Sequence, residues 1–338
     1  MARRRYPWQD LDDDELLKLR FRDLGLKLAD SPVRARVARL HAELAQKGLR
    51  FRPHAWLSTE WFSPDGVPGI AVPCYLAHPR LARLERAQMR DVEGGTEAAC
   101  MRLLRHEAGH ALDSAYRLHR LKRWRDVFGD WSQPYENAYT PRPYSKSYVM
   151  HLDMWYAQSH PAEDFAETFA VWLTPRSEWR KRYAGWPALE KLMAVDALVR
   201  SLAGRAPPVR TREETERLSA LPQTLGEHYE ARRLRTAMLR PALFDPVLRR
   251  LYPEGPGPSE PAASFLRRHR AQLRRAVGTW TGIYRHAIDQ LLEGMIQRAD
   301  ELELRRRRPS AEALADAIVV LTVQTMNHFH SSRFRLMR

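Results

Sequence analysis

Residues 106–110 read His-Glu-Ala-Gly-His and place a carboxylate between two imidazoles. If this stretch is helical, His106 and His110 lie one turn apart and project from the same face. Two imidazoles in this arrangement can bind one zinc ion, and Glu107 then lies where it can take a proton from a metal-activated water. The pattern therefore predicts a zinc site that performs hydrolysis.

The residues around this motif favour a helix. No proline occurs in residues 101–116, and apolar residues recur at three- and four-residue spacing, as on the buried side of a helix. Residues 93–97 (EGGTE) are typical of a loop followed by a helix cap. The alternative is a buried helix that carries two histidines without a metal. It is less favoured, because a glutamate on an apolar helix is costly when nothing compensates its charge.

A catalytic zinc site needs a third protein ligand, and residues 160–170 are the next concentrated source of ligands. Pro161 suits the first position of a helix, which would place Glu163 and Glu167 one turn apart on one face. We assign Glu163 to the metal and Glu167 to a hydrogen bond with His106, whose tautomer it would fix. The alternative is that these acids lie there because they suit the helix dipole.

Several other residues are potential ligands but are less favoured. His151, Asp153 and His160 share no helical face with a second carboxylate, and we expect them in loops or at the surface. Asp113 lies one turn beyond the second histidine of the motif. We expect it to support the site without binding the ion.

With a glutamate on a second helix as third ligand, the chain resembles the gluzincins, whose active-site helix carries the HExxH motif. Residues 156–170 (YAQSHPAEDFAETFA) are similar to the metal-binding helix of anthrax lethal factor-like peptidases and of bacterial "putative zinc-binding metallopeptidases". The resemblance spans residues 49–200 and is strongest at 100–113 and 148–175. It implies a zincin-like fold and bound zinc, but it identifies no substrate.

The same resemblance implies a role for Tyr156, which stands seven residues before Glu163. In lethal factor the tyrosine at this position faces the zinc. A phenol there can stabilise an oxyanion or donate a proton to a leaving amine. Tyr148 and Trp155 are close in the sequence, so aromatic packing is the alternative role for Tyr156.

The segment before the motif predicts a small sheet. Residues 49–62 are rich in aromatic and β-forming residues, a turn signal follows at 64–66, and 69–77 read as a second strand. Pro73 cannot donate a ladder hydrogen bond, so we expect this strand at a sheet edge. There it could pair with an extended peptide substrate, or an ordinary hairpin could simply close the core.

The predicted fold class is α+β, with three regions along the chain. They are an N-terminal helical segment (1–48), a zincin-like metallopeptidase domain (49–203) and a basic, mostly helical C-terminal region (204–338). The boundary follows from the sequence Ala-Gly-Arg-Ala-Pro-Pro at 203–208. In the last region, helical patterns occupy residues 211–221, 226–239, 263–304 and 310–329.

Composition narrows the class of protein. Two cysteines in 338 residues provide neither a disulfide framework nor a cysteine-rich zinc site. No stretch has the pattern of a signal peptide or a membrane span, so we expect a cytoplasmic protein without a membrane partner. The oligomeric state does not follow from the sequence.

The charge raises a second hypothesis. The chain carries 56 basic and 41 acidic residues, and residues 201–338 hold 24 and 15 of them, a difference of +9. Arginine suits phosphate, and residues 305–308 are four arginines in a row, so a nucleic-acid-associated protein is one alternative. It is less favoured, because no nucleic-acid-binding motif is found and arginine is frequent throughout the chain.

The sequence as a whole predicts a zinc-dependent peptidase that acts on a peptide or protein substrate. A third hypothesis, a zinc-binding scaffold without catalysis, is disfavoured by the intact Glu107. The residues assigned to the site are His106, His110 and Glu163 as Zn²⁺ ligands, Glu107 as general base, Tyr156 for the oxyanion, and Glu167 and Asp113 as supporting residues.

Overall fold

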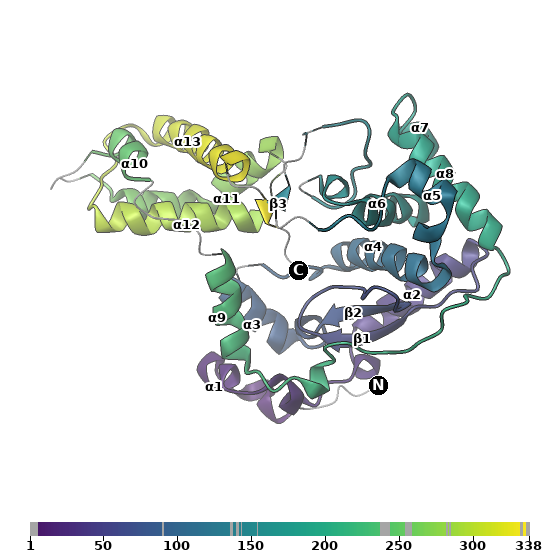
Figure 1. Cartoon of the computed structure of the whole chain (residues 1–338). Coiled ribbons are helices and arrows are strands. Elements are labelled where there is room, and N and C mark those ends of the chain that lie inside the picture. Colours follow the sequence, from purple (N-terminus) through teal and green to yellow (C-terminus); the bar gives the residue numbers. More distant parts are fainter. Residues whose placement is uncertain are drawn as a thin grey trace. The chain divides into compact units, whose positions relative to one another are not determined.

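The chain folds into two compact units that divide after Glu230 (Figure 1). The computed structural model describes residues 6–89, 91–135, 138–139, 142, 144–153, 155–236, 244–253, 259–281, 283, 285–331 and 334–335. Residues 1–5 of the predicted N-terminal segment lie outside this set. All residues that the sequence assigns to the candidate site belong to the first unit.

The described residues are mostly helical, with few strands. The first unit holds α1 (Asp13–Leu17), α2 (Val33–Gln46), β1 (His54–Ser58), β2 (Gly69–Pro73), α3 (Pro79–Met89), α4 (Glu97–Tyr116), α5 (Lys122–Phe128), β3 (Ala138–Tyr139), α6 (Pro161–Leu173), α7 (Trp179–Arg182) and α8 (Ala188–Leu202). Helix α9 (Leu225–Thr236) starts in this unit. The second unit holds α10 (Asp245–Leu251), α11 (Ala262–Thr281), α12 (Arg285–Glu301), α13 (Ser310–Ser331) and β4 (Phe334–Arg335).

The predicted small sheet is present, but it is not a hairpin. Strands β1 and β2 pair in parallel, with Ser58 opposite Pro73, so the chain crosses over between them. Phe62, in the connection, forms an antiparallel bridge with Ala71 on β2. Strand β2 ends at Pro73, and residues 74–76 form a 3₁₀ helix, so the predicted strand 69–77 was too long. The fold is α+β at this coarse level.

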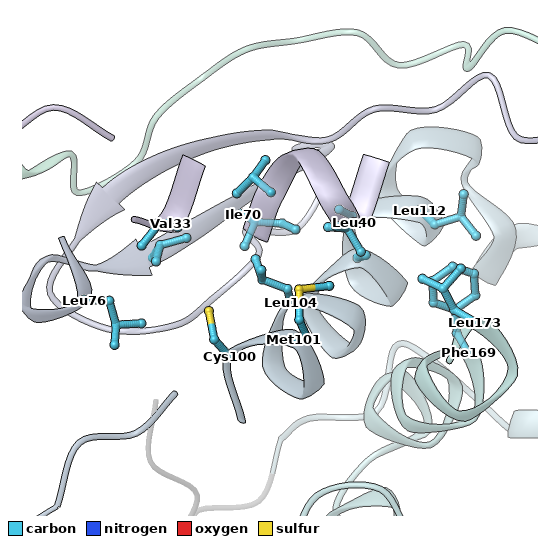
Figure 2. Packing of buried hydrophobic residues seen from close by; sticks show 14 of the residues in the cluster. Val33, Leu40, Ile70, Leu76, Cys100, Met101, Leu104, Leu112, Phe169 and Leu173 are labelled. Atoms are coloured by element: carbon cyan, nitrogen blue, oxygen red, sulfur yellow. The ribbon is translucent and has the colours of Figure 1, made fainter. Parts of the chain in front are cut away.

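Helix α4 is the centre of the first unit. It packs against β2 and α2 on one side and against α6 on the other (Figure 1). Met101 and Leu104 of α4 lie between Ile70 of the sheet and Phe169 of α6, and all four are buried (Figure 2). A helix with apolar neighbours on several sides has little freedom to move. The motif histidines are therefore carried by a rigid element.

Both helices of the predicted site begin where the sequence signals indicated. The Thr96 side chain accepts a hydrogen bond from the backbone N–H of Ala99 at 3.1 Å and caps α4. Pro161 is the first residue of α6, and His160 caps this helix with Nδ1, which accepts from the N–H of Ala162. The structure thus confirms the predicted starts of the two helices.

The predicted helix at 211–221 was wrong. Apart from a 3₁₀ turn at Leu218–Ala220, this segment is irregular and lies along β1. Three β1 side chains donate to its backbone carbonyls, at 2.9 Å each: His54 to residue 213, Trp56 to residue 215 and Ser58 to residue 216. Carbonyls bound in this way are not available to a helical ladder, so tertiary contacts outweigh the local helix propensity.

Residues 204–230 also belong to the first unit. The N–H of Gly204 donates to the carbonyl of Gly48, and that of Leu225 donates to the carbonyl of Leu19. The compact division thus falls later in the chain than the boundary at 203 predicted from the Pro-rich sequence. The three predicted regions, as functional divisions, stay predictions.

In the second unit the helical pattern 263–304 forms two helices, α11 and α12, and the pattern 310–329 corresponds to α13. Many of its arginines are paired with carboxylates. Arg270 contacts the buried Asp289 at 2.6 Å, Arg298 contacts Asp245 at 2.6 Å, and Arg268 contacts Glu260 at 2.5 Å. These pairs neutralise part of the positive charge locally. Among the described residues, no helix has the length and apolar character needed to span a membrane.

A buried ion pair ties α4 to α2. Arg105 Nε and Nη2 lie 2.8 Å from the two carboxylate oxygens of Glu43, and both side chains are buried. We expect Glu43→Ala to lower the free energy of unfolding by about 3–5 kcal/mol, because it leaves a buried guanidinium without its carboxylate. Urea denaturation measures this loss. The control is Arg39→Ala, which removes a half-exposed partner of the same carboxylate and should cost under ~1 kcal/mol. Equal losses in the two variants would contradict the prediction.

Candidate metal centre

Helices α4 and α6 bring three potential metal ligands to one point. His106 Nε2 and His110 Nε2 are 3.2 Å apart, and Glu163 Oε2 lies 3.1 Å from each of them. His106 and Glu163 are buried, whereas 18% of the His110 side chain is exposed. His110 therefore marks the side of the cluster that is open to solvent.

Glu167 orients the first imidazole. Its Oε1 lies 2.8 Å from His106 Nδ1, and its Oε2 accepts a hydrogen bond from the N–H of Leu152 at 2.7 Å. Burial raises the pKa of Glu167, but the hydrogen bond to His106 and the neighbouring imidazoles outweigh this effect and lower it. An ionised carboxylate can only accept, so His106 Nδ1 carries a proton and its Nε2 is directed at the other ligand atoms.

The three converging atoms fit a zinc ion. Ligands that surround zinc tetrahedrally at about 2.0–2.1 Å lie ~3.3 Å from one another, close to the separations found here. Burial raises the pKa of Glu163, but the two imidazoles outweigh it and hold that pKa well below its ordinary value. Two imidazole nitrogens that face each other beside a buried anion favour positive charge between them. One divalent ion supplies it, and two His with one Glu are ligands that zinc accepts.

Gly109, inside the motif, permits the close approach of the two helices. A Cβ at this position would lie 2.7 Å from Cα of Ala166, in the backbone of α6. Any larger residue would push the helices apart and move Glu163 away from the histidines. The spacing of the motif residues predicts the two histidines on one face, but no sequence signal assigns this glycine a role.

Glu107 is buried beside the cluster. Its backbone carbonyl accepts a hydrogen bond from the Ser63 hydroxyl at 3.0 Å, which links the motif to the loop between β1 and β2. Burial raises the pKa of the Glu107 carboxyl, and the opposing effect of His106 and His110 does not cancel the rise. A carboxylate whose pKa is raised is better matched to proton transfer near neutral pH.

Tyr156 also lies at the cluster. Its ring centroid is 5.6 Å from that of His106, with the planes tilted by 49°. Burial and the negative charge of Glu163 raise the pKa of the phenol well above its ordinary value, so the hydroxyl keeps its proton. A protonated phenol beside the cluster is a potential hydrogen-bond donor to a reacting group.

The remaining candidates have other partners. Asp113 accepts hydrogen bonds from the N–H and Nδ1 of His119, at 2.7 and 2.6 Å, so its contact is with a residue outside the cluster. His151 Nε2 bonds the carbonyl of Arg102 at 3.0 Å, and Asp153 lies 3.7 Å from the Arg102 guanidinium. His160 lies in the irregular segment directly before α6, where it is buried and caps the helix.

Tyr135 was missed by the sequence analysis. Its hydroxyl donates to Glu163 Oε1 at 3.0 Å. It lies in an irregular segment with no periodicity and stands 28 positions before Glu163, so no sequence signal connects the two residues.

Comparison with known proteins supports a metal-binding site in this region. Residues 83–181 match a family described as "Putative zinc-binding metallo-peptidase". The match contains the motif of α4 and the carboxylates of α6. Searches of curated proteins and of solved structures gave no match. This region is therefore similar to a zinc-binding metallopeptidase family, and zinc is the metal that the family description and the ligand set share.

The packing at Gly109 can be tested by Gly109→Ala. The added methyl group meets the backbone of α6, so we expect about 1–3 kcal/mol lower stability and, because the ligands separate, at least tenfold weaker zinc binding. Thermal denaturation and competition with a chelator measure the two effects. A variant that matches the wild type in both would mean that the helices do not need this close contact.

Proposed function

We propose that the first unit is a zinc-dependent peptidase of gluzincin type with a zincin-like fold, acting on a peptide or protein substrate. The observation that carries the proposal is the convergence of His106, His110 and Glu163 from two helices. Glu107 and Tyr156 lie beside the same cluster. The similarity of residues 83–181 to a zinc-binding metallopeptidase family supports the same class of activity.

In this proposal His106, His110 and Glu163 hold the ion, and Glu167 keeps His106 in the tautomer that binds it. Bound zinc would lower the pKa of a water molecule toward ~7 and polarise the scissile carbonyl. The buried ligand set leaves its exposed side at His110, which is where a substrate would approach.

The remaining chemistry belongs to two side chains. The Glu107 carboxylate takes a proton from the attacking water and passes it to the leaving nitrogen, a transfer for which its raised pKa is suited. The Tyr156 hydroxyl donates a hydrogen bond to the oxyanion as it develops. Glu107 is carried by α4, which also carries the motif histidines, and Tyr156 lies in a short 3₁₀ helix (Tyr156–Gln158) that packs against α6.

Metal content tests the ligand assignment. Wild-type protein purified without added zinc should contain about one zinc per chain, and Glu163→Ala should lose most of it, because two imidazoles alone form an incomplete site. Elemental analysis measures the content, with circular dichroism to establish that the variant is folded. A folded Glu163→Ala protein that keeps its full zinc would show that another residue completes the site.

Glu107→Gln separates metal binding from catalysis. The amide preserves size but cannot accept the proton, so we expect unchanged zinc content and a loss of hydrolysis of at least about 10²-fold. Cleavage of a random peptide library, followed by mass spectrometry, provides the measurement without a known substrate. Full activity in this variant would exclude Glu107 as the base. A zinc-loaded wild type that cleaves no peptide in the library would instead favour the non-catalytic scaffold.

A further inference from the structure

We propose that Tyr135 is a positioning residue that holds Glu163 with one oxygen toward the metal and the other turned away. This inference rests on the proposed zinc site. It assigns Tyr135 a task distinct from that of Tyr156. Tyr135 acts through a metal ligand, whereas Tyr156 is the candidate for contact with the substrate.

The two oxygens of Glu163 have different surroundings. Oε2 lies 3.1 Å from both motif imidazoles, where the ion would be held. Oε1 accepts the hydrogen bond of the Tyr135 hydroxyl at 3.0 Å. If the carboxylate turned to bring both oxygens to the ion, Oε1 would move from the position in which it accepts the bond of Tyr135. That bond therefore favours a single-oxygen ligand and keeps the rest of the coordination sphere free for water and substrate.

Tyr135 is held in place by the helix that carries Glu163. Its ring stacks on that of His160, with centroids 3.8 Å apart and planes at 15°. His160 Nδ1 accepts the N–H of Ala162, so the ring proton is on Nε2, which donates to the carbonyl of Gln133 at 2.9 Å. Through His160, the loop with Gln133 and Tyr135 is fastened to the start of α6.

This arrangement couples the loop to the ligand. Glu163 lies in the first turn of α6, and His160 caps this helix, so the phenol and the carboxylate are positioned from the same end of the same helix. The hydrogen bond is one of the outer contacts that orient a metal ligand, and loss of such a contact typically weakens metal binding by 10–100-fold.

The test is Tyr135→Phe, which removes the hydroxyl and leaves a ring that can still stack on His160. The matched control is Tyr116→Phe, which also removes a hydrogen bond donated by a phenol, here to the backbone carbonyl of Arg205 at 2.7 Å, at the far end of α4. Both proteins and the wild type are loaded with Co²⁺ in place of zinc, and their visible absorption is recorded. Metal affinity is measured by chelator competition.

We expect the Co²⁺ bands of Tyr135→Phe to weaken and shift, as they do when the coordination number rises above four, and its metal affinity to fall by about 10-fold or more. Tyr116→Phe should resemble the wild type in both measurements. A Tyr135→Phe spectrum and affinity equal to those of the wild type would overturn the proposal.

These readouts separate the inference from the peptidase proposal, because neither depends on turnover. If Tyr135→Phe alters the Co²⁺ spectrum but the wild type cleaves no peptide, the role of Tyr135 is supported and the peptidase proposal is contradicted. If the spectrum is unaltered and the wild type is an active peptidase, the peptidase proposal is supported and the role of Tyr135 is contradicted. A folded wild type that takes up neither Co²⁺ nor Zn²⁺ would overturn both proposals.

Discussion

The close packing of α4 on α6 is the constraint on which the candidate site depends. Each helix presents two ligand-type side chains one turn apart, but a site forms only if the two pairs meet. They meet because Gly109 leaves no Cβ in the path of the Ala166 backbone. The sheet and α2 support the other side of α4, so the helix cannot retreat from α6 (Figure 1). The geometry of the candidate site and the packing of the core therefore depend on the same contact between α4 and α6.

Buried carboxylates have different partners in the two units. Around α4 the buried carboxylates are matched to imidazoles, with Glu163 at both motif histidines and Glu167 at His106, which creates a place for a cation. In the second unit the buried Asp289 is matched to Arg270 and Arg274, whose permanent charges complete the pair without an ion. The same pairing removes part of the basic surface on which a nucleic-acid role would depend.

Local signals predicted the parts of the fold that depend on neighbours in sequence. The starts of α4 and α6 follow from Thr96 and Pro161, whose effect on a helix end requires no distant contact. Prediction failed where distant contacts decide. Residues 211–221 have a helical pattern, but their backbone carbonyls accept hydrogen bonds from β1 side chains. The hairpin that the sequence offered as an alternative is instead a parallel pair of β1 and β2, with Phe62 of the connection bridged to β2. No periodicity within a segment reports such partners.

The sequence by itself determined the chemistry available to this protein: which side chains can bind a metal, which can carry a proton, and their spacing on each helix. It did so because helical geometry converts a spacing of four residues into a shared face. Only the tertiary structure decided which of them meet. It joined Glu163 and Glu167 to the motif histidines, gave Asp113 to His119 instead, and added Tyr135 from an irregular loop. Contacts of this kind depend on how closely two helices pack and on where a loop is held. Both are determined by the side-chain volumes of the whole core, which no single segment of sequence reports.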